Sequence, residues 1–184
     1  INGGSIVEDP SARGTGDAGA MYRGILMRNS EVGASSVAID TVLFRFICGN
    51  LLIWGAIYDK RFKRRHVGTR VTRDAVREIG RIARDWTSQS AGRDEAMIRT
   101  LIDLELAHTR EAVVDELRAI GATKDQAERA YASAEQNESA SPRSFWGLAQ
   151  GMTRISQDTG FQDARYQLDQ LAAKVLARGA RVAA

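Results

Sequence analysis

The sequence changes its hydrophobic period once, near Gly68, and this change constrains the fold more than any other feature. Before Gly68, short apolar and aromatic runs separated by turn-forming residues indicate strands. After it, apolar residues recur every three or four positions, which indicates amphipathic helices. Strands followed by helices are typical of an α+β fold. We therefore expect a small antiparallel sheet of about four strands within residues 21–67, followed by a bundle of four to six helices.

The expected strands lie at residues 22–28, 36–40, 51–54 and 58–66. The first two flank a polar turn, which predicts a hairpin. The third is apolar enough to be buried, and the fourth is rich in lysine and arginine, which is typical of an edge strand. Residues 41–47 fit a strand or a short helix, and we favour a short helix or strand end that stops at Gly49 and Asn50.

The expected helices lie at residues 72–88, 94–107, 110–120, 123–136, 142–157 and 161–177. Gly121 stands where a left-handed helix end favours glycine. Thr123 and Gln126 have the spacing of a capping box. Ser141 followed by Pro142 predicts the start of the fifth helix, with proline in the first helical position.

The length of 184 residues suits one domain, or one domain with a helical extension. We expect a flexible lead-in over residues 1–20, a sheet with a basic helix over 21–90, and a helical part over 91–184 packed on the same core. No apolar run approaches the roughly 20 residues that cross a bilayer, so no membrane partner is expected. The single cysteine, Cys48, is expected to be buried and favours a reducing, cytoplasmic location. The start at Ile1 suggests a fragment or a processed product.

Positive charge is concentrated in one block of the chain. The net charge is +3, but residues 60–84 carry +8, against −2 for residues 1–59 and −3 for residues 85–184. Such a block can attract a polyanion even though the whole molecule is nearly neutral.

A helix through this block would separate its charged side chains from its apolar ones. At 100° per residue, five arginines share an arc of about 80°, and we name them the arginine ridge: Arg70, Arg73, Arg77, Arg81 and Arg84. The apolar residues fall on the other side: Val76, Ile79, Ile82, Ala83 and Trp86. Because each guanidinium offers two donors in a plane that matches phosphate, the ridge could follow a nucleic-acid backbone.

A second basic cluster precedes the ridge and is interleaved with aromatic residues. Its members are Lys60, Arg61, Lys63, Arg64, Arg65 and His66. Tyr58 and Phe62 could stack on unpaired bases, whereas Trp54 is more typical of a core residue. The ridge, the cluster and these two aromatic residues are the predicted nucleic-acid-binding site.

Two other interpretations of the ridge stay open. Asp74, Glu78 and Asp85 lie beside it and can pair with its arginines, which would give an ordinary salt-bridged surface. Three carboxylates cannot neutralise the ten positive charges of residues 60–84, so the remaining arginines could instead meet another subunit.

No catalytic residue, cofactor or metal is predicted. The sequence has no zinc-type Cys/His set, phosphate-binding glycine loop, nucleophile elbow or dinucleotide fingerprint. Glu105 and His108 have the spacing of half a dimetal carboxylate site, but the second half is missing. Residues 113–134 could form a helix-turn-helix, although a plain helical hairpin fits their charges better.

Four short stretches occur in an order that resembles a known family. They are LMRNSEVG at 26–33, FRFICGN at 44–50, RHVG at 65–68 and FWGLAQGMT at 145–153. This succession, over roughly residues 22–178, is similar to the C-terminal part of the phage- and plasmid-borne family known as domain of unknown function 932. The resemblance implies a role in DNA metabolism or host defence inside a bacterial host cell. A fold-level analogy extends to phage single-strand annealing proteins of the Erf and RecT kind.

The leading hypothesis is a non-enzymatic protein that binds single-stranded nucleic acid, with DNA as the expected partner, and that anneals strands, in some cases as a homo-oligomer. The alternative is a self-assembly or interaction protein of a mobile element, whose ridge meets an acidic surface on another copy or on a partner. The acidic faces of the later helices could supply it, among them the acidic face formed by Asp103, Glu105, Glu111, Asp115 and Glu116. A third hypothesis is an enzyme acting on nucleic acid, with catalytic groups supplied by an absent N-terminal part.

Overall fold

A computed structural model of the chain describes residues 6–7, 20–28, 37–45, 51–53, 57, 61–64, 70–88, 91–138 and 140–184. Within these residues it contains one antiparallel sheet of five strands, followed by six helices. The α+β class and the order of strands before helices are therefore confirmed. For residues 61–64 and 70–75 the structure describes the backbone and not the side chains.

Two nine-residue strands form the main ladder of the sheet. β2 (Ala20–Arg28) pairs antiparallel with β3 (Val37–Arg45) over eight residue pairs, which confirms the predicted hairpin. The strand continues through residues 41–45, which corrects the expectation of a short helix or strand end there. Thr41, Val42 and Leu43 are all buried, so both faces of β3 are covered. A strand that is covered on both faces has a continuous run of apolar residues and lacks the alternating pattern of a half-exposed strand.

Three short strands complete the sheet. β1 (Ile6–Val7) pairs with β2, whereas β4 (Leu51–Leu52) and β5 (Arg61–Arg64) both pair with β3. The sheet thus has one strand more than expected, because β1 lies within the stretch predicted to be a flexible lead-in. Among the described strands β5 has a single neighbour, as expected for an edge strand. The division into domains at residues 20 and 90 stays a prediction.

The first two helices differ from their predicted limits. α1 (Arg70–Ser88) begins two residues earlier than expected, and α2 (Ala91–Asp103) begins and ends earlier. After α2 the backbone pairs with the segment before the fifth helix: Leu106 donates to the Arg143 carbonyl at 2.8 Å, and Phe145 donates to the Leu104 carbonyl at 3.1 Å. These bonds replace further helical turns.

The next two helices begin and end as their sequence signals predict. Gly121, with φ 116°, ends α3 (Arg110–Ile120) in the left-handed conformation. The capping box at the start of α4 (Lys124–Asn137) is present. The Thr123 hydroxyl accepts from the Gln126 backbone at 3.2 Å, and the Gln126 side chain accepts from the Thr123 backbone at 2.9 Å.

The fifth helix starts later than predicted. Ser144, not Ser141, caps α5 (Phe145–Gln157), because its hydroxyl accepts from the Gly147 backbone at 3.0 Å. Ser141 instead accepts at its carbonyl from the Ser144 backbone at 2.9 Å and so forms a turn before the helix. α6 (Gln162–Val182) follows and extends beyond the predicted limit at residue 177.

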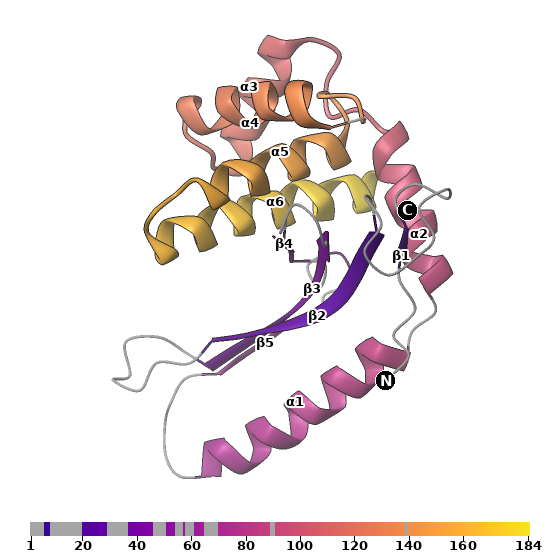
Figure 1. Ribbon diagram of the computed structural model, residues 1–184, viewed down its shortest axis with the longest axis vertical. Coiled ribbons are helices and arrows are strands. Elements are labelled where there is room, and N and C mark those ends of the chain that lie inside the picture. The colour runs from indigo at the N-terminus through magenta and orange to yellow at the C-terminus, as the bar shows by residue number, and fades with distance from the viewer. Residues whose placement is uncertain are drawn as a thin grey trace.

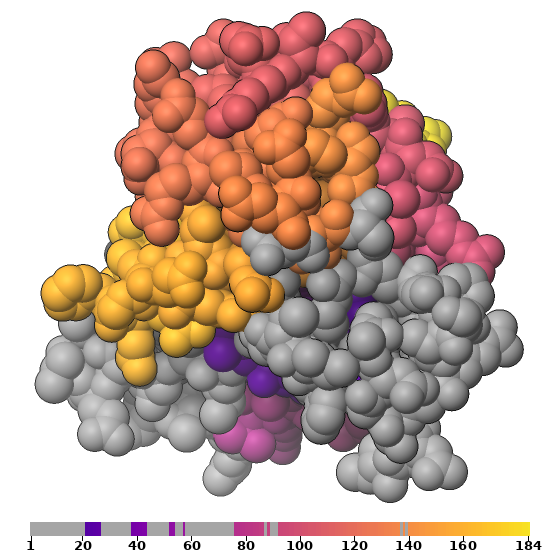
Figure 2. All heavy atoms as spheres, turned by 45° about the horizontal axis from the view of Figure 1, so that its top comes forward, coloured from indigo at the N-terminus to yellow at the C-terminus, as the bar shows by residue number. Residues whose placement is uncertain are grey.

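The helices are distributed unequally over the sheet (Figure 1). α1 lies alone against one face, and α3, α4, α5 and α6 lie on the other side. The larger core lies on that side and includes Trp146, Leu148 and Met152 of α5 with Val175 and Leu176 of α6. Figure 2 shows these helices as one continuous surface, with α1 emerging at the opposite end of the same view. Within the described residues, no helix is both long enough and apolar enough to span a bilayer.

Two glycines of the sequence FWGLAQGMT let α5 approach its neighbours closely. A Cβ atom on Gly151 would collide with the carbonyl oxygen of Ala130 in α4, and a Cβ on Gly147 would collide with the carbonyl oxygen of Ser141. This stretch, which carries part of the family resemblance, therefore allows close packing of α5 in the helical core.

Candidate nucleic-acid interface

All five positions of the arginine ridge belong to one helix. α1 spans 19 residues from Arg70 to Ser88, so it includes the ridge from its first member to its last. Arg77, Arg81 and Arg84 are exposed, while Ile82 and Trp86 on the other side of the helix are buried. The side chains of Arg70 and Arg73 lie outside what the structure describes. At the described positions, charge and apolar surface are separated as the helical wheel predicts.

One apolar residue of α1 does not face the interior as expected. Val76 is 61% exposed, although the helical wheel places it on the apolar side. On the wheel it stands about 80° from Trp86, the best-buried residue of the helix, and therefore at the border of the apolar side. The buried side of α1 is narrower than the sequence alone indicates.

The exposed arginines of the ridge differ in their surroundings. Arg81 binds Glu78 through two hydrogen bonds of 3.0 and 2.5 Å and binds Asp85 at 2.9 Å. The hydrogen bond from Arg81 lowers the pKa of Glu78, and the same bond raises the pKa of Arg81. Arg77 forms no ion pair with any other described residue. The salt-bridged interpretation thus applies to Arg81, whereas Arg77 offers a guanidinium that no described carboxylate neutralises.

A group of three side chains fixes α1 against the rest of the molecule. The indole nitrogen of Trp86 donates to the Gly24 carbonyl of β2. Arg23, the neighbouring residue in β2, places its guanidinium carbon 4.9 Å from the centre of the Trp86 ring. The same guanidinium binds Asp94 in the first turn of α2, with Nη2 2.5 Å from Oδ2. Because Asp94 is almost fully buried, this charge pair joins β2, α1 and α2 away from water.

The helical period places Trp86 on the apolar side of α1, but no pattern in the sequence pairs Arg23 with Asp94. The available signal was an arginine inside an otherwise apolar strand, because a charge buried in a sheet requires an opposite charge nearby.

The second basic cluster is described only in part. β5 places Arg61, Lys63 and Arg64 on the edge of the sheet, and residues 65–69 join this strand to the start of α1. The side chains of β5, including that of Phe62, lie outside what the structure describes. So do the whole residues Trp54, Tyr58, Lys60, Arg65, His66 and Cys48.

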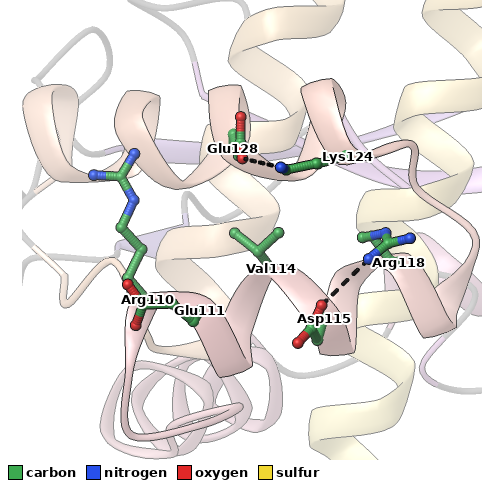
Figure 3. A pocket seen from close by; sticks show the side chains of 7 residues that line it. All are labelled: Arg110, Glu111, Val114, Asp115, Arg118, Lys124 and Glu128. Atoms are coloured by element: carbon green, nitrogen blue, oxygen red, sulfur yellow. Dashed lines mark hydrogen bonds and ion pairs between the residues drawn. The ribbon is translucent and has the colours of Figure 1, made fainter.

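A groove between α3 and α4 differs from the ridge in its charge (Figure 3). Its volume is about 310 Å³, and three basic and three acidic residues line it with Val114. Arg118 pairs with Asp115 at 3.4 Å and Lys124 pairs with Glu128 at 3.7 Å, each within its own helix. This balance of charges gives the groove no preference for a polyanion.

Glu105 and His108, which have the spacing of half a dimetal site, lie in a small group of charged side chains with Arg143. Glu105 binds Arg143 at 2.9 Å, and His108, which is exposed, lies 3.5 Å from the same carboxylate. In the part of the chain that the structure describes, no three His, Cys, Asp or Glu residues gather closely enough to hold a metal ion.

Comparison with known proteins gives one result. The family model described as Domain of unknown function (DUF932) matches residues 10–176. Neither a curated protein nor a solved structure matches the chain. The matched range includes α1 with its ridge, the Arg23–Trp86–Asp94 group and the glycines of α5, and it covers well over half of the sequence. The chain therefore belongs to the DUF932 family.

Proposed function

We propose that this protein is a non-enzymatic single-stranded nucleic-acid-binding protein of a phage or plasmid, with DNA as its ligand and strand annealing as its role in DNA metabolism. The observation that carries the proposal is the exposure of Arg77, Arg81 and Arg84 on α1, on the side turned away from the buried residues Ile82 and Trp86. A helix anchored on one side can present the other side to a polyanion without rearranging.

The dimensions and position of α1 suit this role. At a rise of 1.5 Å per residue, the ridge spans about 21 Å, which is long enough to contact several consecutive phosphates. α1 is the only described helix on its face of the sheet, so no other described helix covers the ridge (Figure 1). The basic edge strand β5 is the element that precedes this helix in the chain, with residues 65–69 between them.

Binding should depend steeply on salt, because each neutralised phosphate releases condensed counterions. For four phosphates on a single strand, the affinity should fall roughly 50-fold between 50 and 200 mM salt. A filter-binding titration of a labelled single-stranded oligonucleotide at these two concentrations measures this fall. Equal affinity at both concentrations, or no binding at 50 mM, would contradict the proposal.

A double charge reversal tests the site itself. Arg77→Glu with Arg81→Glu should abolish binding and leave the fold intact, because both side chains are exposed. The matched control is Arg118→Glu with Arg129→Glu, which changes the net charge equally on exposed positions of α3 and α4. If both double variants lose the same affinity, the ridge is not the site and only the total charge matters.

The annealing role requires a second measurement. Mixing two complementary labelled strands with the protein should accelerate duplex formation, and the ridge variant should not. Binding without acceleration would leave nucleic-acid binding supported and would contradict annealing.

The self-assembly hypothesis is less well supported, because three of the five carboxylates of the acidic face already pair with arginines of the same chain. Glu105 pairs with Arg143, Asp115 with Arg118, and Glu116 with Arg178 at 2.6 Å. A ridge on a second copy would have to displace these arginines. A mass measurement in low and high salt tests this hypothesis, since ridge-dependent oligomers without nucleic-acid affinity would favour it.

A further inference from the structure

A second pocket lies on the side of the sheet away from α1, where the turn between α3 and α4 meets α6. Its volume is about 370 Å³, within the usual range for small-molecule sites of roughly 300 to 1,000 Å³. The residues that line it are Gly121, Thr123, Gln126, Tyr166, Gln167, Gln170, Leu171 and Lys174. None of them belongs to the arginine ridge.

The described residues that line this pocket carry charge of one sign. Among them Lys174 alone has a formal charge at neutral pH, and none carries a carboxylate. Lys174 is exposed and forms no ion pair with a described residue, unlike Lys124, which pairs with Glu128 in the neighbouring groove (Figure 3). Its ammonium nitrogen lies 3.8 Å from the position that a Cβ on Gly121 would occupy. The ammonium group therefore lies beside Gly121 at the pocket, where an anion can reach it.

Three of the residues that line the pocket carry carboxamides: Gln126, Gln167 and Gln170. The Nε2 atom of Gln170 is buried and has no hydrogen-bond partner among the described residues. A buried donor without an acceptor is unfavourable, and a ligand oxygen or ring nitrogen would relieve it. Gln126 uses its oxygen to accept from the Thr123 backbone, so its NH₂ group remains as a donor. Gln167 is exposed at the same pocket.

The apolar part of the pocket is fixed by a contact with the sheet. The hydroxyl of Tyr166 donates to Oδ2 of Asp40 at 3.2 Å, and Asp40 is buried in β3. The hydroxyl therefore points towards the sheet, and the ring contributes aromatic surface to the pocket beside Leu171.

We infer that this pocket binds a nucleoside monophosphate. Lys174 contacts the phosphate, the glutamine carboxamides contact the edge of the base, and Tyr166 with Leu171 contacts its face. Carboxamides suit a base edge because they combine donors and acceptors in one plane, as the bases do. The inference does not rest on the proposed function, since the pocket and the ridge share no residue.

Isothermal titration calorimetry of the full chain with each of the four deoxynucleoside monophosphates, and with inorganic phosphate, tests the inference. At least one nucleotide should bind more tightly than phosphate. Lys174→Gln should weaken that binding at least about tenfold, the effect of losing one good charge-assisted contact. Gln170→Leu should weaken nucleotide binding while leaving phosphate binding unchanged. The matched control Lys124→Gln removes an exposed lysine outside the pocket and should have no effect.

Three results would overturn the inference: no binding of any of the four nucleotides, equal affinity for nucleotide and inorganic phosphate, or equal losses in Lys174→Gln and Lys124→Gln. The double ridge variant Arg77→Glu with Arg81→Glu should bind the nucleotide normally. Loss of oligonucleotide binding with retained nucleotide binding therefore separates the two sites.

Discussion

The indole N–H of Trp86 donates a hydrogen bond to the carbonyl oxygen of Gly24, 3.1 Å away, and this bond ties α1 to β2. Arg23, the residue before Gly24, covers the same indole ring and binds Asp94 of α2. The direction in which α1 presents its arginines is therefore set by one aromatic residue and one buried charge pair.

Trp86→Phe should lower the free energy of unfolding by about 1 to 2 kcal/mol, because the ring remains while the hydrogen bond and part of the cation–π contact are lost. Trp86→Ala also leaves a cavity and should lower it by about 3 to 5 kcal/mol. Urea denaturation followed by circular dichroism measures both changes. A Phe variant as stable as the original protein would show that the bond to Gly24 does not hold α1.

Removing one charge of the buried pair of Arg23 and Asp94 should destabilise the protein more than replacing both charges. Asp94→Ala removes the carboxylate that binds the largely buried guanidinium of Arg23 and should lower the free energy of unfolding by about 3 to 5 kcal/mol. Replacing both charges, with Arg23→Met and Asp94→Leu, should restore much of that loss. The same denaturation experiment compares the two variants. A double variant that is no more stable than Asp94→Ala would show that the loss in Asp94→Ala does not come from the buried charge of Arg23.

Glu78 competes with phosphate for Arg81, since it holds that guanidinium through two hydrogen bonds. Glu78→Gln should therefore raise the affinity for single-stranded DNA by about two- to fivefold at low salt, because it removes a negative charge beside the ridge and one of the two carboxylates that bind Arg81, leaving Asp85. Filter binding measures the change, with Glu128→Gln on α4 as the matched control. Unchanged or weaker binding in Glu78→Gln would argue against Arg81 as a phosphate contact.

The features that the sequence predicted best are local ones. Gly121 and the pair of Thr123 and Gln126 act within a few residues of themselves, so their spacing is enough to place the end of α3 and the start of α4. The wheel placed Arg77 and Arg81 opposite Trp86 for the same reason, since the period of a helix fixes its faces.

The features that the sequence missed depend on distant partners. Arg23 and Asp94 are 71 residues apart, and nothing in either neighbourhood indicates the other. Ser141 and Ser144 are both good caps, and the choice of Ser144 follows from the pairing of residues 104–106 with 143–145. The exposure of Val76 depends on how much of α1 the sheet covers. The spacing of apolar residues within one helix does not give that information.

Gly151 should not tolerate even one added carbon. A Cβ at this position would collide with the Ala130 carbonyl oxygen and would lie 3.1 Å from Cβ of Ala134, so α4 and α5 must separate. Although alanine favours a helix over glycine, we expect Gly151→Ala to lower the free energy of unfolding by about 1 to 3 kcal/mol. Gly160→Ala is the control, because nothing lies within 4 Å of its added Cβ, and it should change stability by less than about 0.5 kcal/mol. Equal effects of the two substitutions would contradict the close packing of α5.

Asp169 should make the stability of the protein depend on pH. Burial raises the pKa of its carboxyl group to about 6, against the opposing effects of Ser156 and Arg165. The Ser156 hydroxyl oxygen lies 2.7 Å from the Thr153 carbonyl oxygen and 2.8 Å from Oδ1 of Asp169. The Ser156 hydroxyl has one proton and can donate it to only one of these two oxygens. If Asp169 is protonated, it can donate to the Ser156 oxygen while Ser156 donates to the Thr153 carbonyl, so both contacts are hydrogen bonds.

Between about pH 4 and pH 6 the folded protein therefore holds a proton that the unfolded chain has released, so stability falls as the pH rises through this range. Asp169→Asn keeps the shape of the side chain and cannot ionise. The two proteins should be about equally stable near pH 4, and at pH 7.5 the Asn variant should be the more stable by up to roughly 3 kcal/mol. Urea denaturation at both pH values measures this difference. A difference that stays constant with pH would show that Asp169 ionises in the folded protein as it does in water, and that the α5–α6 interface carries no buried acid.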